Sequence, residues 1–207
     1  MPRDIPPSIL HLIDEHRRWL EGRGGSQLDR QGHDLSELDL SERDLSRAAL
    51  DGANLAGARL YGAVLDGACL RRCDLYAVEA DSVSMRGADL TQACLVKADL
   101  GHARLIGACL RQADLRRAVL FAADLSSADL REAALFKAGL DGARLEGADL
   151  AGADIGRAAL HGACFTGARL KGLRNLDAAQ MDWIEVVGRR LEGPEARHWL
   201  EAAAASD

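Results

Sequence analysis

A five-residue repeat dominates the sequence and constrains its fold more than any other feature. Between residues 35 and 170 every fifth position is Leu in 24 of 28 cases. Ala stands two residues before that position in 22 of the 28, without a break from Ala88 to Ala168. No insertion interrupts the phase over residues 33–172. The fold must therefore repeat one local conformation every five residues.

This period excludes an ordinary amphipathic helix. Five helical steps of about 100° would turn each Leu by about 140° from the last, so the leucines would form no stripe. Gly also ends twelve of the pentads and is a poor helix former. In an extended segment, residues two apart point the same way. The pentad predicts a short strand that buries Ala and Leu, then a turn, with further copies stacked above and below.

The composition indicates a core made almost entirely of two residue types. The 207 residues include 37 Ala and 33 Leu but only eight aromatics. Charged residues make up 28%, and no apolar run approaches 18 residues, so we expect no membrane span. The start of the chain has no apolar stretch of the signal-peptide type, and five Cys is an odd count. Free thiols in a reducing cytoplasm are the expectation.

The repeat resembles the Ala-(Asp/Asn)-Leu-X-X motif of the pentapeptide-repeat family. Runs such as 53–55 (Ala-Asn-Leu), 88–90 (Ala-Asp-Leu) and 148–150 (Ala-Asp-Leu) carry the resemblance, which covers about two thirds of the chain. The resemblance implies an all-β solenoid, a right-handed quadrilateral β-helix with one pentad on each side. The 28 pentads over residues 33–172 would then form seven coils. An outward series of cations at intervals of 20 residues also indicates four pentads per coil: Lys97, Arg117, Lys137 and Arg157.

The flanking segments are expected to cap the solenoid. In the lead-in, residues 1–32, we predict an amphipathic helix over 8–21, with Trp19 as the plug of the N-terminal mouth. In residues 173–207 we predict two C-terminal helices, 178–191 and 195–205. Some family members dimerise through such helices, so the resemblance implies a homodimer; the alternative is a monomer whose helices only seal the last coil. The expected dimer contacts are Trp183, Val187, Leu191, Trp199 and Leu200.

Sequence motifs for catalysis are missing. The six His are scattered, with no zinc-ligand spacing, and there is no glycine-rich phosphate loop and no nucleophile elbow. We therefore expect no enzyme activity, no metal and no cofactor. Cys69 and Cys109 share a side but lie two coils apart, about 9.6 Å, which is too far for a disulfide.

The net charge of −6 is concentrated on one predicted side of the solenoid and on the C-terminal segment, residues 173–207. The side centred on residues 40, 60, 80 and onward carries six carboxylates against one cation, Arg59, while the other three sides are nearly neutral. On the same side the repeat weakens around Ala80, which replaces a central Leu. Either Val78 and Val83 offset the lost volume, or the stretch is adapted to a partner. The predicted partner-binding residues are Asp39, Glu42, Glu79, Asp81, Asp99 and Asp141.

Two classes of function are open at this point. One is a non-catalytic scaffold that binds a protein partner of unknown identity. The other follows from the resemblance, because quinolone-resistance members of the family mimic the DNA duplex with acidic surfaces and bind DNA gyrase or another type II topoisomerase. The acidic balance argues against direct nucleic-acid binding, and the series of cations leaves it only as a weaker alternative.

Overall fold

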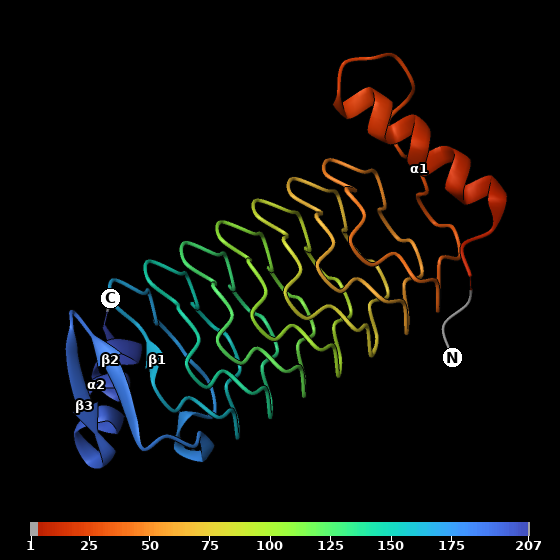
Figure 1. The fold of residues 1–207 in the computed structure, drawn as a ribbon. Coiled ribbons are helices and arrows are strands. Elements are labelled where there is room, and N and C mark those ends of the chain that lie inside the picture. Colours follow the sequence, from red (N-terminus) through yellow and green to blue (C-terminus); the bar gives the residue numbers. More distant parts are fainter. Residues whose placement is uncertain (1–3, 207) are drawn as a thin grey trace.

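The computed structural model describes residues 4–206, most of which form a stack of short, similar coils (Figure 1). Parallel β-bridges join residues 20 positions apart, for example Asp34 to Asn54 and Asn54 to Asp74. Four pentads therefore make one turn of the chain, as the 20-residue spacing of the cations indicated. The chain is a β-helix solenoid, and the prediction of this fold class is confirmed.

The backbone explains why one pentad forms one side. The N–H of Leu55 donates to the carbonyl of Asp74 in the next coil (2.7 Å), and the N–H of Gly57 donates to Tyr76 (2.9 Å). The N–H of Ala58 closes the turn onto Leu55 (3.0 Å). Gly57 has a φ of +63°, the left-handed region in which Gly has no steric penalty. Each pentad thus contains a short β-bridge and a corner residue in the left-handed region of φ.

The core is a column of side chains inside the coils. Every central residue from Leu35 to Leu170 is at most 3% exposed. The irregular stretch keeps this arrangement, because Val78, Ala80, Val83 and Met85 are all fully buried. Ala80 has a smaller side chain than the Leu of other pentads, and Val78 and Val83 have larger side chains than the Ala that they replace. The gain in volume offsets the loss, so the packing density of the core stays constant.

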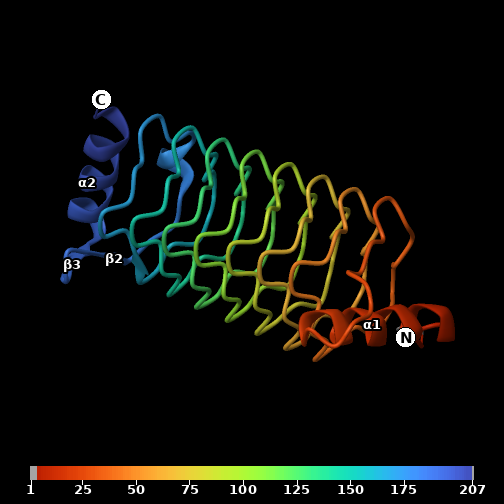
Figure 2. The same ribbon diagram turned by 90° about the horizontal axis from the view of Figure 1, so that it is seen from above.

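Helix α1 (Pro7–Leu20) covers the N-terminal end of the stack (Figures 1 and 2). This confirms the helix expected over 8–21. The expectation for Trp19 is wrong: its ring is half-buried, stacked on His16 at 5.5 Å and covered by the Arg47 guanidinium at 5.1 Å. Ile13 is the buried apolar residue of α1 instead. Trp19 lies in the last turn of α1, so it borders the first coil rather than filling its mouth.

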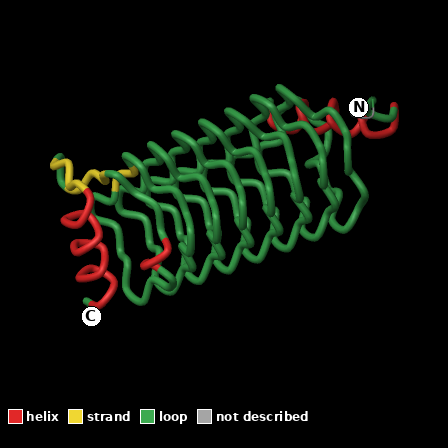
Figure 3. Tube along the Cα trace, turned by 90° about the horizontal axis from the view of Figure 1, so that it is seen from below, coloured by secondary structure: helices red, strands yellow, loops and turns green. Residues whose placement is uncertain are grey.

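The C-terminal end is closed by a β-hairpin and a helix. Strand β1 (Ala163–Cys164) of the last coil pairs in parallel with β2 (Trp183–Val186), which pairs antiparallel with β3 (Arg189–Glu192). A short 3-10 turn, η1 (Leu176–Ala178), precedes the hairpin, and α2 (Gly193–Ala205) follows it. Figure 3 shows the strands in yellow at this end.

The helix predicted over 178–191 is therefore wrong, whereas the helix predicted over 195–205 is confirmed within α2. The last coil offers unpaired backbone groups to the chain that follows it. Gly162 donates its N–H to Trp183 (2.8 Å), and Phe165 donates to Glu185 (2.8 Å). A strand satisfies these groups, and a helix, whose backbone groups bond internally, could not.

Candidate protein-binding surface

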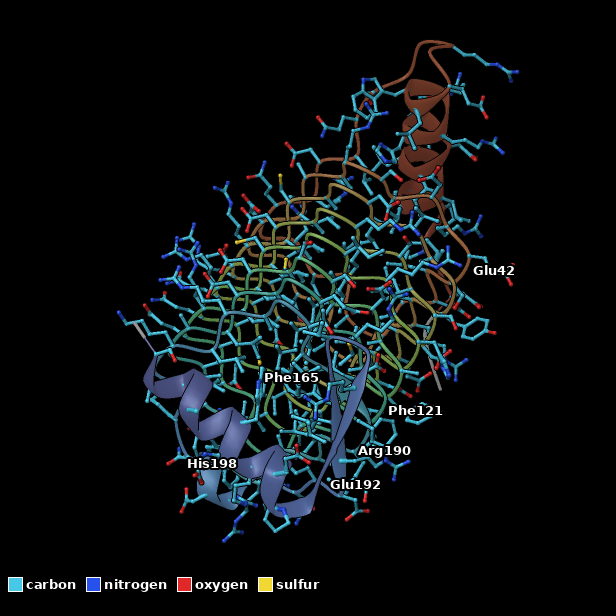
Figure 4. All side chains as sticks on the ribbon, turned by 90° about the vertical axis from the view of Figure 1, so that its left-hand side faces the viewer. Glu42, Phe121, Phe165, Arg190, Glu192 and His198 are labelled. Atoms are coloured by element: carbon cyan, nitrogen blue, oxygen red, sulfur yellow. The ribbon has the colours of Figure 1, made fainter. Side chains whose placement is uncertain are left out.

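The solenoid brings the six predicted carboxylates to one side, which we call the acidic side. It consists of the pentads centred on residues 40, 60, 80, 100, 120, 140 and 160. One outward position of these pentads forms a continuous series of bridges through Asp39, Arg59, Glu79, Asp99 and Val119. In a view along the solenoid from its C-terminal end, Glu42 and Phe121 lie on the same flank (Figure 4).

Local hydrogen bonds stabilise the ionised form of two of these carboxylates. Ser41 hydrogen-bonds to Asp39 through its side chain and backbone, which lowers the pKa of that carboxyl below its ordinary value. The Ser82 hydroxyl donates to Asp81 (2.7 Å) and His102 lies 3.2 Å away, so the pKa of Asp81 is lowered as well.

The acidic side is not an unbroken row of negative charge. The Arg59 guanidinium donates to Glu79 at 2.8 Å and compensates one of the six carboxylates. Val119 and Gly139 occupy the bridge positions after Asp99. The series therefore alternates charged, paired and uncharged positions, unlike a chain of phosphates.

Exposed apolar side chains share this surface, and the sequence analysis missed them. Tyr61 is 56% exposed, Phe121 is 51% exposed and Val119 is 46% exposed. The His102 ring meets Phe121 edge-on at 5.5 Å. The 20-residue period that groups the charges also places Tyr61 and Phe121 beside the carboxylates.

The five predicted dimer residues fall into two groups. Leu200 is fully buried and Leu191 is 6% exposed, so both pack inside the protein. Trp183 lies against Gly162 and under the Arg190 guanidinium, 4.5 Å from its ring centre. Val187, at the tip of the hairpin, is 72% exposed. Val187 and Trp199 border a cleft of about 550 Å³ between the hairpin and α2, together with Val186, Arg189, Leu191, Glu195, His198 and Ala202.

The thiols and possible metal ligands are dispersed. All five cysteines are free. Burial raises the pKa of the Cys73 thiol to about 12, so it is a poor nucleophile. Within residues 4–206 no three His, Cys, Asp or Glu side chains are grouped to hold a metal ion. Neither helix in that range is long and apolar enough to cross a bilayer.

This solenoid of Ala-x-Leu pentads defines a class of β-helical repeat proteins. The family model for pentapeptide repeats matches eight copies, over residues 39–75, 84–120, 98–135 and 135–172. These matches cover more than half of the chain. The chain belongs to the pentapeptide-repeat family.

Several solved pentapeptide-repeat proteins are similar to this chain. Rfr23 from the cyanobacterium Cyanothece 51142 is 36% identical over 45% of this chain, which spans only 59% of Rfr23 (TM-score 0.39). HetL from Nostoc sp. strain PCC 7120, involved in the regulation of heterocyst differentiation, is 32% identical over 82% of this chain and 92% of its own (TM-score 0.29). QnrB1, a plasmid-mediated fluoroquinolone resistance protein, is 19% identical over 78% and 89% (TM-score 0.36). The comparison with curated proteins gave no match.

Proposed function

We propose that this protein is a non-catalytic scaffold that binds a protein partner through the acidic side. The observation that carries the proposal is the grouping of exposed Tyr61, Val119 and Phe121 with the carboxylates of the same side. Aromatic side chains surrounded by polar groups are typical of the energetic centre of protein interfaces. The matching partner surface has an apolar centre and basic residues around it.

A binding experiment with two matched variants tests this surface. The full-length protein is immobilised, the retained proteins are identified, and their affinities are then measured with purified components. We expect Phe121→Ser to weaken binding at least tenfold. Ile106→Ser removes a partly exposed apolar side chain from another side and should leave the affinity unchanged. Equal affinities for wild type and Phe121→Ser would refute the proposal.

A DNA-mimicking modulator of DNA gyrase or another type II topoisomerase is the second candidate. The excess of carboxylates on the acidic side supports it, and the Arg59–Glu79 ion pair weakens it. In a supercoiling assay, reversal of Glu79, Asp81 and Asp99 to Lys should abolish any inhibition or protection, and the wild-type effect should decline as salt rises. A wild type without effect at micromolar concentration would remove this candidate.

The proposal also includes the homodimer. Val187 supports it, because it is 72% exposed and borders an apolar cleft. A second copy of the chain could bury both surfaces. Val187→Asp should shift sedimentation equilibrium toward the monomer, and Val119→Asp, the same change on the coils, should not. A wild type that sediments as a monomer at about 100 µM would leave the C-terminal segment as a cap only.

We also propose that residues 33–172 form seven right-handed coils and that residues 1–32 and 173–207 cap them. The proposed location is the cytoplasm. Bridges at a spacing of 20 residues support the coil number, and the five free thiols support the location.

A further inference from the structure

A second charged surface runs along one corner of the solenoid. Lys97, Arg117, Lys137 and Arg157 occupy the same corner position in four successive coils, and we call them the basic corner. The coils are joined directly at this position. The N–H of Lys97 donates to the carbonyl of Arg116 (3.1 Å), that of Arg117 to Phe136 (3.0 Å) and that of Lys137 to Gly156 (2.9 Å). The four side chains therefore start from one line along the axis.

The charges of the basic corner are not compensated within the protein. All four side chains are exposed, and none forms an ion pair with a carboxylate of residues 4–206. Neighbouring arginines behave differently: Arg116 pairs with Asp114 at 2.6 Å, and Arg131 pairs with Asp129 at 2.5 Å. The basic corner is also the only corner with four cations in consecutive coils among those that the structure describes.

Aromatic rings take the place of carboxylates beside three of the cations. Lys97 Nζ donates to the Tyr76 hydroxyl (2.9 Å) and lies 5.3 Å from the ring centre. Lys137 and Arg157 lie 5.6 Å and 5.9 Å from the centre of the Phe136 ring. An aromatic face attracts a cation without neutralising its charge. The cations are thus positioned but remain available to an external anion.

The distance between successive cations of the basic corner indicates which kind of anionic segment would match it. Successive coils are about 4.8 Å apart, so the four positions span about 14 Å. An α-helix repeats one face about every 5.4 Å and spans about 16 Å over the same three intervals. An extended strand repeats a face about every 6.7 Å and would span about 20 Å. Flexible Lys and Arg side chains absorb the small mismatch with a helix more readily than the large one with a strand.

We propose that the basic corner binds an acidic α-helix of a partner protein, laid parallel to the solenoid axis with one carboxylate on each turn. Single-stranded nucleic acid fits less well, because the rings on which bases would stack are covered by Lys97, Lys137 and Arg157. The proposal does not depend on the function of the acidic side.

The test measures fluorescence anisotropy of a labelled helical peptide with Glu at positions i, i+4, i+7 and i+11. Three further probes are a peptide of the same composition with its Glu spread around the helix, the aligned peptide interrupted by Pro, and an oligo-dT of about 20 nucleotides. The full-length protein is used throughout, at low and moderate salt. We expect the aligned peptide to bind at least tenfold more tightly than the other three probes.

Two charge-matched variants locate the binding surface. Replacing all four cations of the basic corner by Gln should weaken peptide binding at least tenfold. The control replaces four cations on another side by Gln, at Arg71, Arg111, Arg131 and Lys171, and should change binding less than threefold. If the first variant fails to fold, Arg117→Gln and Lys137→Gln, tested singly, should each weaken binding about two- to threefold.

Several results would overturn the proposal. These are an equal loss in both quadruple variants, equal binding of the aligned and spread peptides, or no saturable peptide binding to the wild type at millimolar concentration. Tighter binding of oligo-dT than of the aligned peptide would assign the basic corner to nucleic acid instead.

Discussion

Leu115 occupies the central position of a pentad and is fully enclosed by the coils. Truncating such a residue removes buried methyl groups and leaves a cavity, because the backbone bridges above and below hinder collapse. Leu115→Ala should lower the free energy of unfolding by about 2–5 kcal/mol in urea titrations. Val119→Ala, on the exposed side of the next pentad, should cost less than about 1 kcal/mol. Similar losses for both variants would contradict a core confined to the inward positions.

Cys73 replaces an inward Ala and donates its thiol to the carbonyl of Leu50 (2.8 Å). Burial raises the pKa of this thiol to about 12, above its ordinary value of 9.0. The unfolded chain therefore loses this proton near pH 9 while the folded chain keeps it, and folding stability falls as the pH rises above that value.

The measurement compares wild type with Cys73→Ala, which restores the usual residue of the repeat. Between pH 9 and pH 10 the stability of the wild type relative to the variant should decline by about 1 kcal/mol. A difference that does not change with pH would show that the thiol ionises in the folded state.

At the scale of elements, the C-terminal hairpin depends on Gly162. A Cβ on this residue would lie 2.8 Å from the Trp183 ring, and its φ is +70°. Gly142 has nearly the same φ, +67°, but open space around it. Gly142→Ala should therefore cost about 1–2 kcal/mol from the backbone alone. Gly162→Ala should cost at least about 1 kcal/mol more and change the tryptophan emission. Equal costs would place Trp183 away from the last coil.

The hairpin also shows where prediction from the sequence ended. Ala179, Trp183, Val187 and Leu191 recur every four residues, which suggested a helix over 178–191. The same segment alternates Trp183 and Glu185 with buried Ile184 and Val186, a pattern of strands. The unpaired backbone groups of the last coil favour the strand over the helix. The local sequence pattern of residues 178–191 contains no information about those groups. Within the coils no such choice exists, because every pentad specifies the same bridge and corner.

The candidate site was predictable in part for a similar reason. The 20-residue period was enough to bring Asp39, Glu79 and Asp99 to one side. The Arg59–Glu79 ion pair follows from the same period, because the two residues are 20 positions apart, but charges counted for a whole side do not reveal pairs between coils. The exposure of Tyr61 and Phe121 depends on what their neighbours leave uncovered, and composition alone does not give that.

Helix α1 contains a buried histidine that makes the N-terminal cap sensitive to pH. His16 Nδ1 accepts the N–H of Leu28 (2.9 Å), and burial lowers the pKa of the imidazole below its ordinary value of about 6.5. The unfolded segment binds a proton below that pH while the folded segment does not. The stability of the cap is therefore complete above about pH 6.5 and is lost as the pH falls.

Amide hydrogen exchange of residues 7–28 measures this effect after correction for intrinsic rates. The opening free energy should decrease from pH 7.5 to pH 5.5 in the wild type. His16→Gln keeps an acceptor for Leu28 and cannot titrate, so its opening free energy should stay constant. Parallel pH dependence in both proteins would assign the effect to other groups.

For the whole molecule, the regular bridges predict that one complete coil is dispensable. Deleting residues 98–117 joins Lys97 to Ala118 and keeps every later residue on its side. This variant should fold, with a β-type circular dichroism spectrum and cooperative thermal unfolding. Deleting residues 98–115 removes nearly the same length but shifts the phase by two positions. Arg116 then takes an inward position and Leu120 moves to a corner, so this variant should not unfold cooperatively. Cooperative unfolding of both variants would contradict a solenoid held in register by its pentads.

Each pentad ends in a corner residue whose φ is positive. Because every corner has this same conformation, the length of the molecule can change in steps of one pentad or one coil. Adding a whole coil would separate the two caps by a further 4.8 Å or so without rotating one relative to the other. Adding a single pentad would instead rotate the distal cap by about a quarter turn, and all later surfaces with it. Insertions of coils and of pentads can thus change two properties of such a protein independently during evolution: the distance between its caps and the direction in which its binding faces point. They can do both without redesigning a single interior contact.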